Sequence, residues 1–273
     1  MSGCVRAENA DGMDAELTGT RVLVTGASGG IGSATARALA SEGARVAIHF
    51  HTGRERAETL HTEVGGSSIV VGADLREEGE VEAMYADVVR SFSRLDAVVV
   101  NAGFWRSEDR PLHRMTVDEW RETISADLTS AFLTCRGFLA HLADDPRESA
   151  SIVLVGSTAA LFGEAGHADY AAAKAGMVYG LMRSLKNEIV GLAPRGRVNC
   201  VCPGWTDTPM AVTDGESGAG FDRAMATMAL RKIAEPGDVA SAIVFLTSDR
   251  LAGHISGAIL PVSGGMEGRL LHA

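Results

Sequence analysis

A glycine-rich turn between an expected strand and an expected helix most restricts what this chain can fold into. The apolar, β-branched run at 21–25 leads directly into the glycine-rich residues 26–32, and a helical pattern at 31–42 ends before Gly43. Glycines at such a turn let the backbone approach a diphosphate, and the N-terminus of the helix offers free N–H groups to it. Many of the 32 glycines simply make turns, but a cluster between a strand and a helix indicates dinucleotide binding.

Strand and helix patterns alternate along the chain. We expect strands at 21–25, 45–50, 68–72, 95–100, 151–156, 196–201 and 257–262, and helices near 31–42, 53–63, 77–93, 117–142, 169–190 and 236–247. This alternation predicts an α/β fold with a seven-stranded parallel sheet and helices on both of its faces. Continuous apolar runs such as LDAVVV fit strands that are buried on both sides. No linker divides the chain, so we expect one domain over 17–273, after a polar, disordered extension at 1–16.

Charge and hydropathy argue against two classes of partner. The 273 residues carry a formal net charge of −10 without a long single-sign run, which argues against nucleic acid and favours a soluble protein. No apolar stretch approaches the ~20 residues of a membrane span. The first residues have neither the basic nor the apolar region of a signal peptide, so we expect a cytoplasmic protein.

The cysteines and histidines form no metal-binding pattern, so we expect no metal site. The four cysteines include no C-x-x-C pair, and free, mostly buried thiols are their expected state. Cys200 lies in an expected strand and Cys202 directly after it, so we expect their side chains to face opposite ways. His167 is interpreted as a surface or loop histidine, although it stands three residues before a tyrosine of interest.

Three polar residues indicate chemistry on a carbonyl or an alcohol. Tyr170 and Lys174 stand at i and i+4 and therefore share one face of a helix, and Ser157 ends the apolar run SIVLVGS. A free tyrosine has a pKa of about 10, and a fixed positive charge nearby lowers that pKa towards the range of general acid–base work. The serine can hold a substrate oxygen while the tyrosine exchanges a proton with it. Such a site needs a hydride carrier.

Together these motifs resemble the short-chain dehydrogenase/reductase family, in particular its 3-oxoacyl-reductase-like and carbonyl-reductase-like members. The resemblance covers about residues 18–266 and rests on motifs that occur in the order and spacing of that family. These motifs are Thr25-Gly26-x-x-x-Gly30-x-Gly32, Asn101-Ala102-Gly103, Ser157, Tyr170-x-x-x-Lys174 and Pro203-Gly204. The resemblance implies one doubly wound Rossmann domain, an NAD(P)(H) cofactor and hydride transfer to or from a carbonyl carbon.

The resemblance also implies residue roles and an assembly. Tyr170 would be the general acid/base, Lys174 would lower its pKa and bind the nicotinamide ribose, and Ser157 would orient the substrate oxygen. Homotetramers are common among such relatives, which implies a homo-oligomer, either a tetramer or a dimer. The helices at 117–142 and 169–190 would form one of its interfaces.

The expected cofactor contacts lie at the carboxyl ends of the strands, where open parallel sheets bind ligands. Asp74 matches the family position that contacts adenine. The full expected set is Gly26, Ser28, Gly30, Ile31, Gly32, His51, Thr52, Arg54, Asp74, Leu75, Asn101, Ala102, Gly103, Tyr170, Lys174, Pro203, Gly204, Thr206 and Thr208.

The end of the second strand favours NADP(H) over NAD(H). An acidic residue usually binds the ribose hydroxyls there in NAD enzymes, but this chain has Phe50. Thr52 and Arg54 follow it, and a hydroxyl and a guanidinium can bind a 2′-phosphate that a carboxylate would repel. Two observations count against this preference. Gly29 stands where many NADP-using relatives carry a basic residue, and Arg54 and Arg56 can equally be the solvated first turn of a helix.

Asp127 departs from the family pattern. The family commonly has asparagine at this position of SADLTSAF, where its backbone carbonyl holds a water linked to the lysine. Because that carbonyl belongs to the backbone, the relay can survive the change, and we keep Asp127 among the catalytic residues. The carboxylate would also add a negative charge near Lys174, which is expected to change the pH optimum.

The segment between Pro203 and Pro236 breaks the alternation. We expect a substrate lid at about 205–232, with a plain surface excursion as the alternative. The expected pocket walls suit an apolar or ring-bearing ketone, although each residue could equally pack in the core or at a subunit contact. They are Phe104, Trp105, Arg106, Leu161, Phe162, Trp205 and Met210.

The sequence therefore predicts an NADP(H)-dependent oxidoreductase that moves a hydride between nicotinamide and a small ketone or secondary alcohol. One alternative is an NAD-dependent secondary-alcohol dehydrogenase on the same fold. Another is a non-catalytic dinucleotide sensor or scaffold, since a fold does not settle function. The presence of Ser157, Tyr170 and Lys174 together argues against the sensor, because a silent protein is free to lose them.

Overall fold

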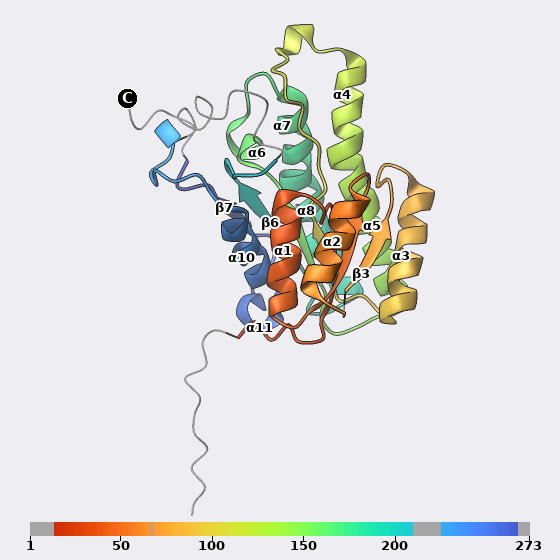
Figure 1. Cartoon of the computed structure of the whole chain (residues 1–273). Helices are drawn as coiled ribbons and strands as arrows, with labels where there is room; N and C mark the ends of the chain where they lie inside the picture. The colour runs from red at the N-terminus through yellow and green to blue at the C-terminus, as the bar shows by residue number, and fades with distance from the viewer. Residues whose placement is uncertain (1–13, 67, 210–224, 267–273) are drawn as a thin grey trace, which may run out of the picture.

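The computed structural model describes residues 14–66, 68–209 and 225–266 and shows one parallel sheet between two layers of helices (Figure 1). The sheet has seven strands in the order β3-β2-β1-β4-β5-β6-β7, and every neighbouring pair is parallel. The strands are β1 (Arg21–Val24), β2 (Arg45–Phe50), β3 (Ile69–Gly72), β4 (Ala97–Val100), β5 (Ser151–Val155), β6 (Arg197–Pro203) and β7 (Ile259–Val262). The predicted doubly wound α/β fold is confirmed, and the chain reverses its winding direction between β1 and β4.

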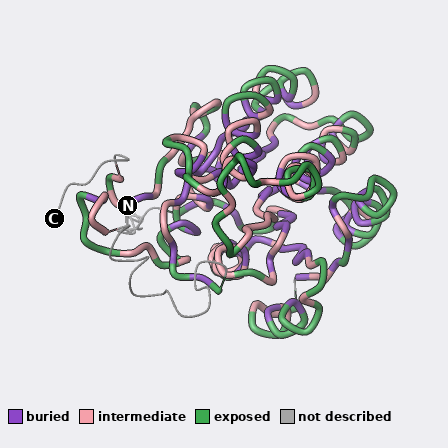
Figure 2. Tube along the Cα trace, turned by 90° about the horizontal axis from the view of Figure 1, so that it is seen from above, coloured by how far each residue is buried: buried purple, intermediate pink, exposed green. Residues whose placement is uncertain are grey.

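Helices bury both faces of the sheet because alternate strand residues point to opposite sides. One face packs against α1 (Gly30–Ser41), α2 (Arg54–Val64), α10 (Pro236–Thr247) and α11 (Asp249–Ala252). The other packs against α3 (Glu78–Phe92), α5 (Ser130–Asp144) and α8 (Met182–Glu188). In β1, Val22 and Val24 join the first cluster and Leu23 joins the second. Figure 2 shows the result, with buried residues in the interior and exposed residues on the outer sides of the helices.

The two longest expected helices are composite. The first consists of α4 (Val117–Thr123), a π-helical segment η2 (Ile124–Thr129) and α5. The second consists of α7 (Ala168–Ala175), the π-helical segment η3 (Gly176–Leu181), α8 and a final 3-10 turn η4 (Ile189–Gly191). Such π segments are frequent at functional sites because they shift the side chains that follow.

Three short elements were not predicted from the sequence: α6 (Thr158–Phe162), α11 and the 3-10 turn η1 (Leu112–Arg114). Serine caps mark two of them. The Ser157 hydroxyl accepts a hydrogen bond from the Ala159 N–H, and the Ser248 hydroxyl accepts one from the Leu251 N–H. A serine that can cap the N-terminus of a helix is the signal that could have found these two helices.

The prediction for Cys200 and Cys202 is wrong. Strand β6 continues to Pro203, so both cysteines lie in the strand, and its two-residue period puts them on the same face. Their sulfur atoms are 3.9 Å apart. They are free and buried, as is Cys135.

Two further expectations fall mostly outside the described residues. The extension at 1–16 is described only from residue 14, and the lid at 205–232 lacks residues 210–224. At the base of the expected lid, Thr206 pairs with Ala234 in an isolated parallel bridge. Within the described part of the chain, no helix combines the length and the apolar character needed to cross a membrane.

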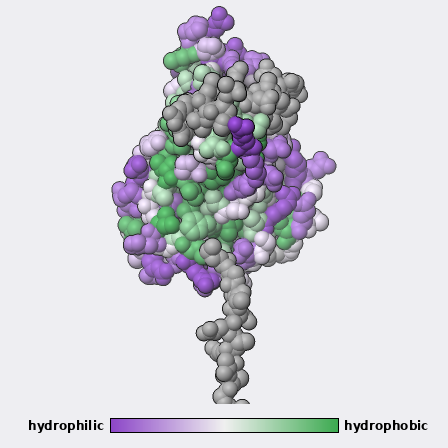
Figure 3. Space-filling model, turned by 90° about the vertical axis from the view of Figure 1, so that its left-hand side faces the viewer, coloured by the Kyte–Doolittle hydropathy of each residue, from purple (hydrophilic) through white to green (hydrophobic). Residues whose placement is uncertain are grey.

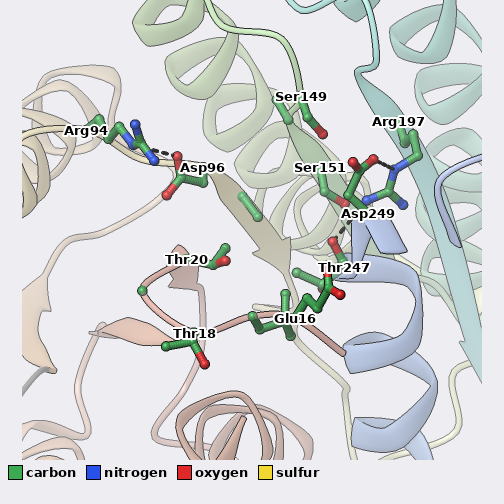
Figure 4. A pocket seen from close by; sticks show the side chains of 14 residues that line it. Glu16, Thr18, Thr20, Arg94, Asp96, Ser149, Ser151, Arg197, Thr247 and Asp249 are labelled. Atoms are coloured by element: carbon green, nitrogen blue, oxygen red, sulfur yellow. Dashed lines mark hydrogen bonds and ion pairs between the residues drawn. The ribbon is translucent and has the colours of Figure 1, made fainter. Parts of the chain in front are cut away.

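Two surface features lie away from the carboxyl ends of the strands. Apolar side chains gather on the side of the molecule that carries α10 and the edge strand β7 (Figure 3), where Phe245 and Leu260 are only partly buried. A hollow of about 310 Å³ lies at the amino ends of β4, β5 and β6 (Figure 4). Arg197 and Asp249 face each other in its wall, with Nε and Oδ1 3.6 Å apart.

Candidate active site

A cleft of about 870 Å³ crosses the carboxyl ends of the strands. It is where an open parallel sheet with this winding is expected to bind a ligand. All of the sequence-predicted site residues line it except Arg54 and Asp127. The predicted residues in its wall are Gly26, Ser28, Gly30, Ile31, Gly32, His51, Thr52, Asp74, Leu75, Asn101, Ala102, Gly103, Ser157, Tyr170, Lys174, Pro203, Gly204, Thr206 and Thr208.

The glycine turn forms a cradle that side chains would fill. Gly26 has a φ of 64°, and a Cβ on it would lie 2.9 Å from the Cα of Ala102. A Cβ on Gly32 would collide with the carbonyl oxygen of Gly26. The turn leads into α1, whose N-terminal N–H groups and dipole favour an anion. Backbone that is bare and close to a helix N-terminus fits the diphosphate of a dinucleotide.

Side-chain hydrogen bonds hold this cradle in place. Asn101 donates from Nδ2 to the Thr25 carbonyl at 3.0 Å, and the Thr25 hydroxyl accepts the Asn101 N–H at 2.9 Å. His49, which sequence reasoning missed, accepts the Gly26 N–H on Nδ1 at 3.0 Å and places Nε2 3.0 Å from the Ala73 carbonyl. Burial lowers the pKa of His49 to about 4, so its neutral ring can join the glycine turn to the end of β3. A histidine inside the otherwise apolar RVAIHF is the signal that could have revealed it.

In the part of the cleft that follows β2, the structure places Arg56 and not Arg54 in the wall. Arg54 does not line the cleft; its Nε lies 3.5 Å from the Glu58 carboxylate, and its side chain is 75% exposed. Arg56 lines the cleft instead and donates from Nε to the Ser28 carbonyl at 3.2 Å. Helix α2 begins at Arg54, so a shift of two residues along its first turn moves a side chain to another face.

Asp74 and Arg76 form an exposed pair in the same part of the cleft. Arg76 donates to both carboxylate oxygens of Asp74, with Nη2 and Oδ2 2.5 Å apart. This hydrogen bonding lowers the pKa of Asp74 to about 2. His51 lies 3.6 Å from the same carboxylate. Arg76 is a cleft residue that sequence reasoning did not include.

At the other end, the structure brings Ser157, Tyr170 and Lys174 together. Ser157 follows β5 by two residues and caps α6, while Tyr170 and Lys174 project from one face of α7. The Lys174 ammonium donates to the Val155 carbonyl at 3.3 Å and lies 5.5 Å from the centre of the Tyr170 ring. Lys174 is only 3% exposed. Tyr170 and Ser157 both line the cleft and are partly exposed to it, while Lys174 is buried behind them.

Asp127 lies directly behind this corner, in the π-helical segment η2. Its side chain is fully buried, and its Oδ1 lies 3.2 Å from the Lys174 ammonium. The same oxygen accepts the Phe104 N–H at 3.2 Å. Oδ2 is buried without a hydrogen-bond partner in the described residues. The carboxylate itself therefore meets the lysine, whereas the family pattern assigns the link to the backbone carbonyl.

Burial and charge act against each other on these groups. Burial raises the pKa of Tyr170; the Lys174 ammonium and hydrogen bonding to Ser157 lower it, the Asp127 carboxylate raises it, and the net direction is upward. The expected lowering by Lys174 is thus one contribution that burial outweighs. Burial also lowers the pKa of Lys174, but Asp127 and Tyr170 raise it by more, so the ammonium form is favoured. Burial raises the pKa of Asp127, which Lys174 partly offsets.

Aromatic side chains wall the cleft beside Tyr170. Trp105 stacks on the His167 ring at 3.8 Å and meets the Tyr170 ring edge-on at 4.8 Å, measured between ring centres. His167 lies in the loop before α7, as one of the two expectations had it, but it is not at the surface. It is 4% exposed, and its Nε2 lies 3.1 Å from Asp109 Oδ1.

The other expected pocket walls divide into three groups. Phe104 and Trp205 line the cleft. Leu161 packs against the core, Phe162 is exposed, and Arg106 pairs with Glu122. Met210 lies outside the described residues. Across the described ranges, no three His, Cys, Asp or Glu side chains gather as a metal site would require.

Known proteins resemble this chain over nearly its whole length. A family model described as enoyl-(acyl carrier protein) reductase matches residues 26–267. A 3-oxoacyl-[acyl-carrier-protein] reductase of Synechocystis is 35% identical over 254 residues, covering 92% of this chain and 98% of that protein. The cis-4-hydroxycyclohexanecarboxylate dehydrogenase of Sinomonas cyclohexanicum is 39% identical over 249 residues, covering 89% of this chain and 94% of that protein. A crystal structure of a short-chain alcohol dehydrogenase from Sinorhizobium meliloti aligns with a TM-score of 0.83 at 30% identity, covering 92% of this chain and 97% of the other.

Proposed function

This chain belongs to the short-chain dehydrogenase/reductase family, an enzyme family that acts on CH–OH and C=O groups, and we propose that it is an NADP(H)-dependent reductase of ketones or dehydrogenase of secondary alcohols. One observation carries the proposal. Ser157, Tyr170 and Lys174 meet at one end of a cleft whose other part is a bare glycine cradle at the N-terminus of α1. Acid–base groups next to a dinucleotide-sized cleft suit hydride transfer at a carbonyl carbon.

Each catalytic residue has a distinct task in this proposal. The nicotinamide, when bound, would supply or accept the hydride. Tyr170 gives a proton to the substrate oxygen during reduction and takes it back during oxidation. Ser157 hydrogen-bonds the same oxygen as negative charge develops on it. Lys174 favours the phenolate form electrostatically, and an N–H that neither Asp127 nor Val155 uses can reach a ribose hydroxyl.

Cofactor choice rests on the end of β2. Phe50 leaves no carboxylate there to repel a 2′-phosphate, and Thr52, Arg56 and Ser28 line the cleft beside it. A guanidinium next to two hydroxyls suits phosphate. Arg56 thus takes the part that the sequence assigned to Arg54. The adenine would lie nearer Asp74 and Leu75.

The substrate is proposed to be a small ketone or secondary alcohol. The walls formed by Trp105 and Trp205 suit a ring, and the Sinomonas relative is named for a cyclic alcohol. We further propose that residues 17–273 act as one catalytic domain in the cytoplasm, with a lid at about 205–232. A homo-oligomer is supported by the apolar side with α10 and β7 (Figure 3) and by exposed Phe132 and Tyr179 on the two composite helices.

The test is a panel of cyclic and linear ketones with NADPH or NADH, followed by nicotinamide fluorescence. We expect turnover with NADPH and a lower dissociation constant for NADPH than for NADH. Turnover that prefers NADH would establish the NAD-dependent dehydrogenase instead. Tight NADPH binding without turnover of any ketone or alcohol would favour a sensor.

A further inference from the structure

Two carboxylates form an acidic rim at the catalytic end of the cleft. Glu164 lines the cleft together with Ser157 and Tyr170. Asp109 stands beside the same loop, since its Cβ and Cγ approach Gly166 and its carboxylate meets the His167 ring. The two carboxylates repel each other: burial raises the pKa of Glu164, and the charge of Asp109 raises it further. We call Asp109 and Glu164 the acidic rim.

In the part of the chain that the structure describes, three cations near the rim are paired with other carboxylates. Arg106 Nη2 lies 3.0 Å from Glu122 Oε2. Arg110 lies 3.1 Å from Glu108 and 3.0 Å from Glu119. The Lys174 ammonium faces Asp127.

His167 does not neutralise the rim either, because burial lowers its pKa and leaves the imidazole neutral at pH 7. Glu164 is exposed, and within the described residues its carboxylate has no hydrogen bond or ion pair with another group. The rim therefore keeps its negative charge at the point where a substrate would enter. An exposed carboxylate at the rim of a cleft attracts a ligand cation, and water screens that attraction so that it stays modest.

An aromatic wall stands next to these charges. Trp105 is fixed by stacking on His167 and by its edge contact with Tyr170, so its position relative to the reacting hydroxyl is set. Trp205 lines the same end of the cleft. Aromatic faces attract organic ammonium groups as well as hydrocarbon rings, and a carboxylate beside a tryptophan is a suitable environment for a protonated amine.

We propose that this end of the cleft binds a ketone or secondary alcohol that carries an ammonium group, which Glu164 holds beside Trp105 while the substrate oxygen meets Tyr170 and Ser157. The inference rests on the proposed function, and it narrows the substrate class of the same site. It separates this chain from the Sinomonas relative, whose named substrate carries a carboxylate.

The experiment compares three cyclohexanones that differ in charge at one position: 4-(dimethylamino)cyclohexanone, the neutral 4-isopropylcyclohexanone, and 4-oxocyclohexanecarboxylate. The values of kcat/KM are measured with NADPH at low ionic strength. We expect the amine to exceed its neutral counterpart by about tenfold, since a partly desolvated ion pair and a cation–π contact add together. The carboxylate should be the poorest substrate.

Two variants separate a local effect from the net charge of the protein. Glu164→Gln should reduce the amine-to-neutral ratio to about 2 or less. Asp144→Asn removes one charge from the exposed end of α5 and should leave the ratio at its wild-type value. The same ratio in wild type and in Glu164→Gln, or a preference for the carboxylate, would overturn the inference.

Binding measured without turnover distinguishes this inference from the proposed reaction. Quenching of tryptophan fluorescence reports binding of the same compounds through Trp105 and Trp205. Selective binding of the amine that depends on Glu164, without reduction of any ketone, would refute the proposed reaction and retain the ammonium site. Reduction of the ketones without charge preference would retain the reaction and refute the ammonium site.

Discussion

A buried cation faces a carboxylate at each end of the sheet, and the two pairs serve different purposes. Lys174 and Asp127 lie 3.2 Å apart below the carboxyl ends of the strands, and Arg197 and Asp249 lie 3.6 Å apart at the amino ends (Figure 4). Both cations are only 3% exposed. The free energy of removing them from water must be offset in both places.

The difference lies in the remaining hydrogen-bond donors. Arg197 donates to the Leu246 carbonyl at 2.7 Å and to the Thr247 carbonyl at 2.9 Å, which satisfies the last turn of α10. Lys174 has three N–H groups, and the carbonyl of Val155 and the carboxylate of Asp127 account for two. The Arg197 Nε is buried without a hydrogen-bond partner in the described residues and faces Asp249. The Arg197 donors are therefore directed at a helix end and a carboxylate, which stabilises structure, whereas Lys174 lines a cleft with one N–H left over and can take part in chemistry.

The largest expected effect is a loss of kcat from a change at the end of the cleft that holds Tyr170. Tyr170→Phe removes the proton donor and keeps the ring that packs against Trp105, so kcat should fall by about 10²–10⁴-fold. NADPH affinity and thermal stability should stay near wild type, as measured by fluorescence titration and by calorimetry. Substantial turnover in this variant would refute the proposed role of Tyr170.

Replacing the other cation should change stability. Arg197→Met leaves two carbonyls of α10 without their donor and removes the buried charge that faces Asp249, so the free energy of unfolding should fall by about 3–5 kcal/mol in urea titrations. The dissociation constant of NADPH should change little at temperatures where the variant is folded. Arg195→Met is the matched control, because Arg195 is exposed and also pairs with Asp249; it should cost at most about 1 kcal/mol. Equal losses in both variants would contradict the distinction.

A smaller effect is expected in the part of the cleft that is proposed to bind the 2′-phosphate. Arg56→Ala removes a guanidinium next to Ser28 and Thr52, so the dissociation constant of NADPH should rise by about 10-fold or more. The constant for NADH, which lacks the 2′-phosphate, should change by less than about 2-fold. Arg54→Ala is the matched control, since Arg54 lies outside the cleft. A loss that is equal for the two nucleotides would show that Arg56 acts only on the fold of the loop.

The sequence predicted the fold and most of the cleft because both depend on local patterns. Apolar runs of strand length define β4 and β5. The glycine turn requires residues without a Cβ, which the sequence shows directly. Details that depend on which way a side chain points were missed. Arg56 lines the cleft where the sequence predicted Arg54. Cys200 and Cys202 lie on the same face of β6, although opposite faces were predicted. His49 escaped because its two hydrogen bonds join segments that are distant in sequence.

The smallest expected effect concerns the pH dependence of the catalytic end. The charge of Asp127 raises the pKa of Tyr170, so Asp127→Asn should lower that pKa. Ketone reduction needs the phenol, and its alkaline limb should therefore move to lower pH. Alcohol oxidation needs the phenolate, and its acidic limb should move in the same direction, by about 1 pH unit in each case. Rate profiles measured in both directions on folded protein test this. If the variant loses rate but its pH–rate profiles do not shift, Asp127 is only a structural partner of Lys174. The Lys174–Asp127 pair would then resemble the Arg197–Asp249 pair in its role.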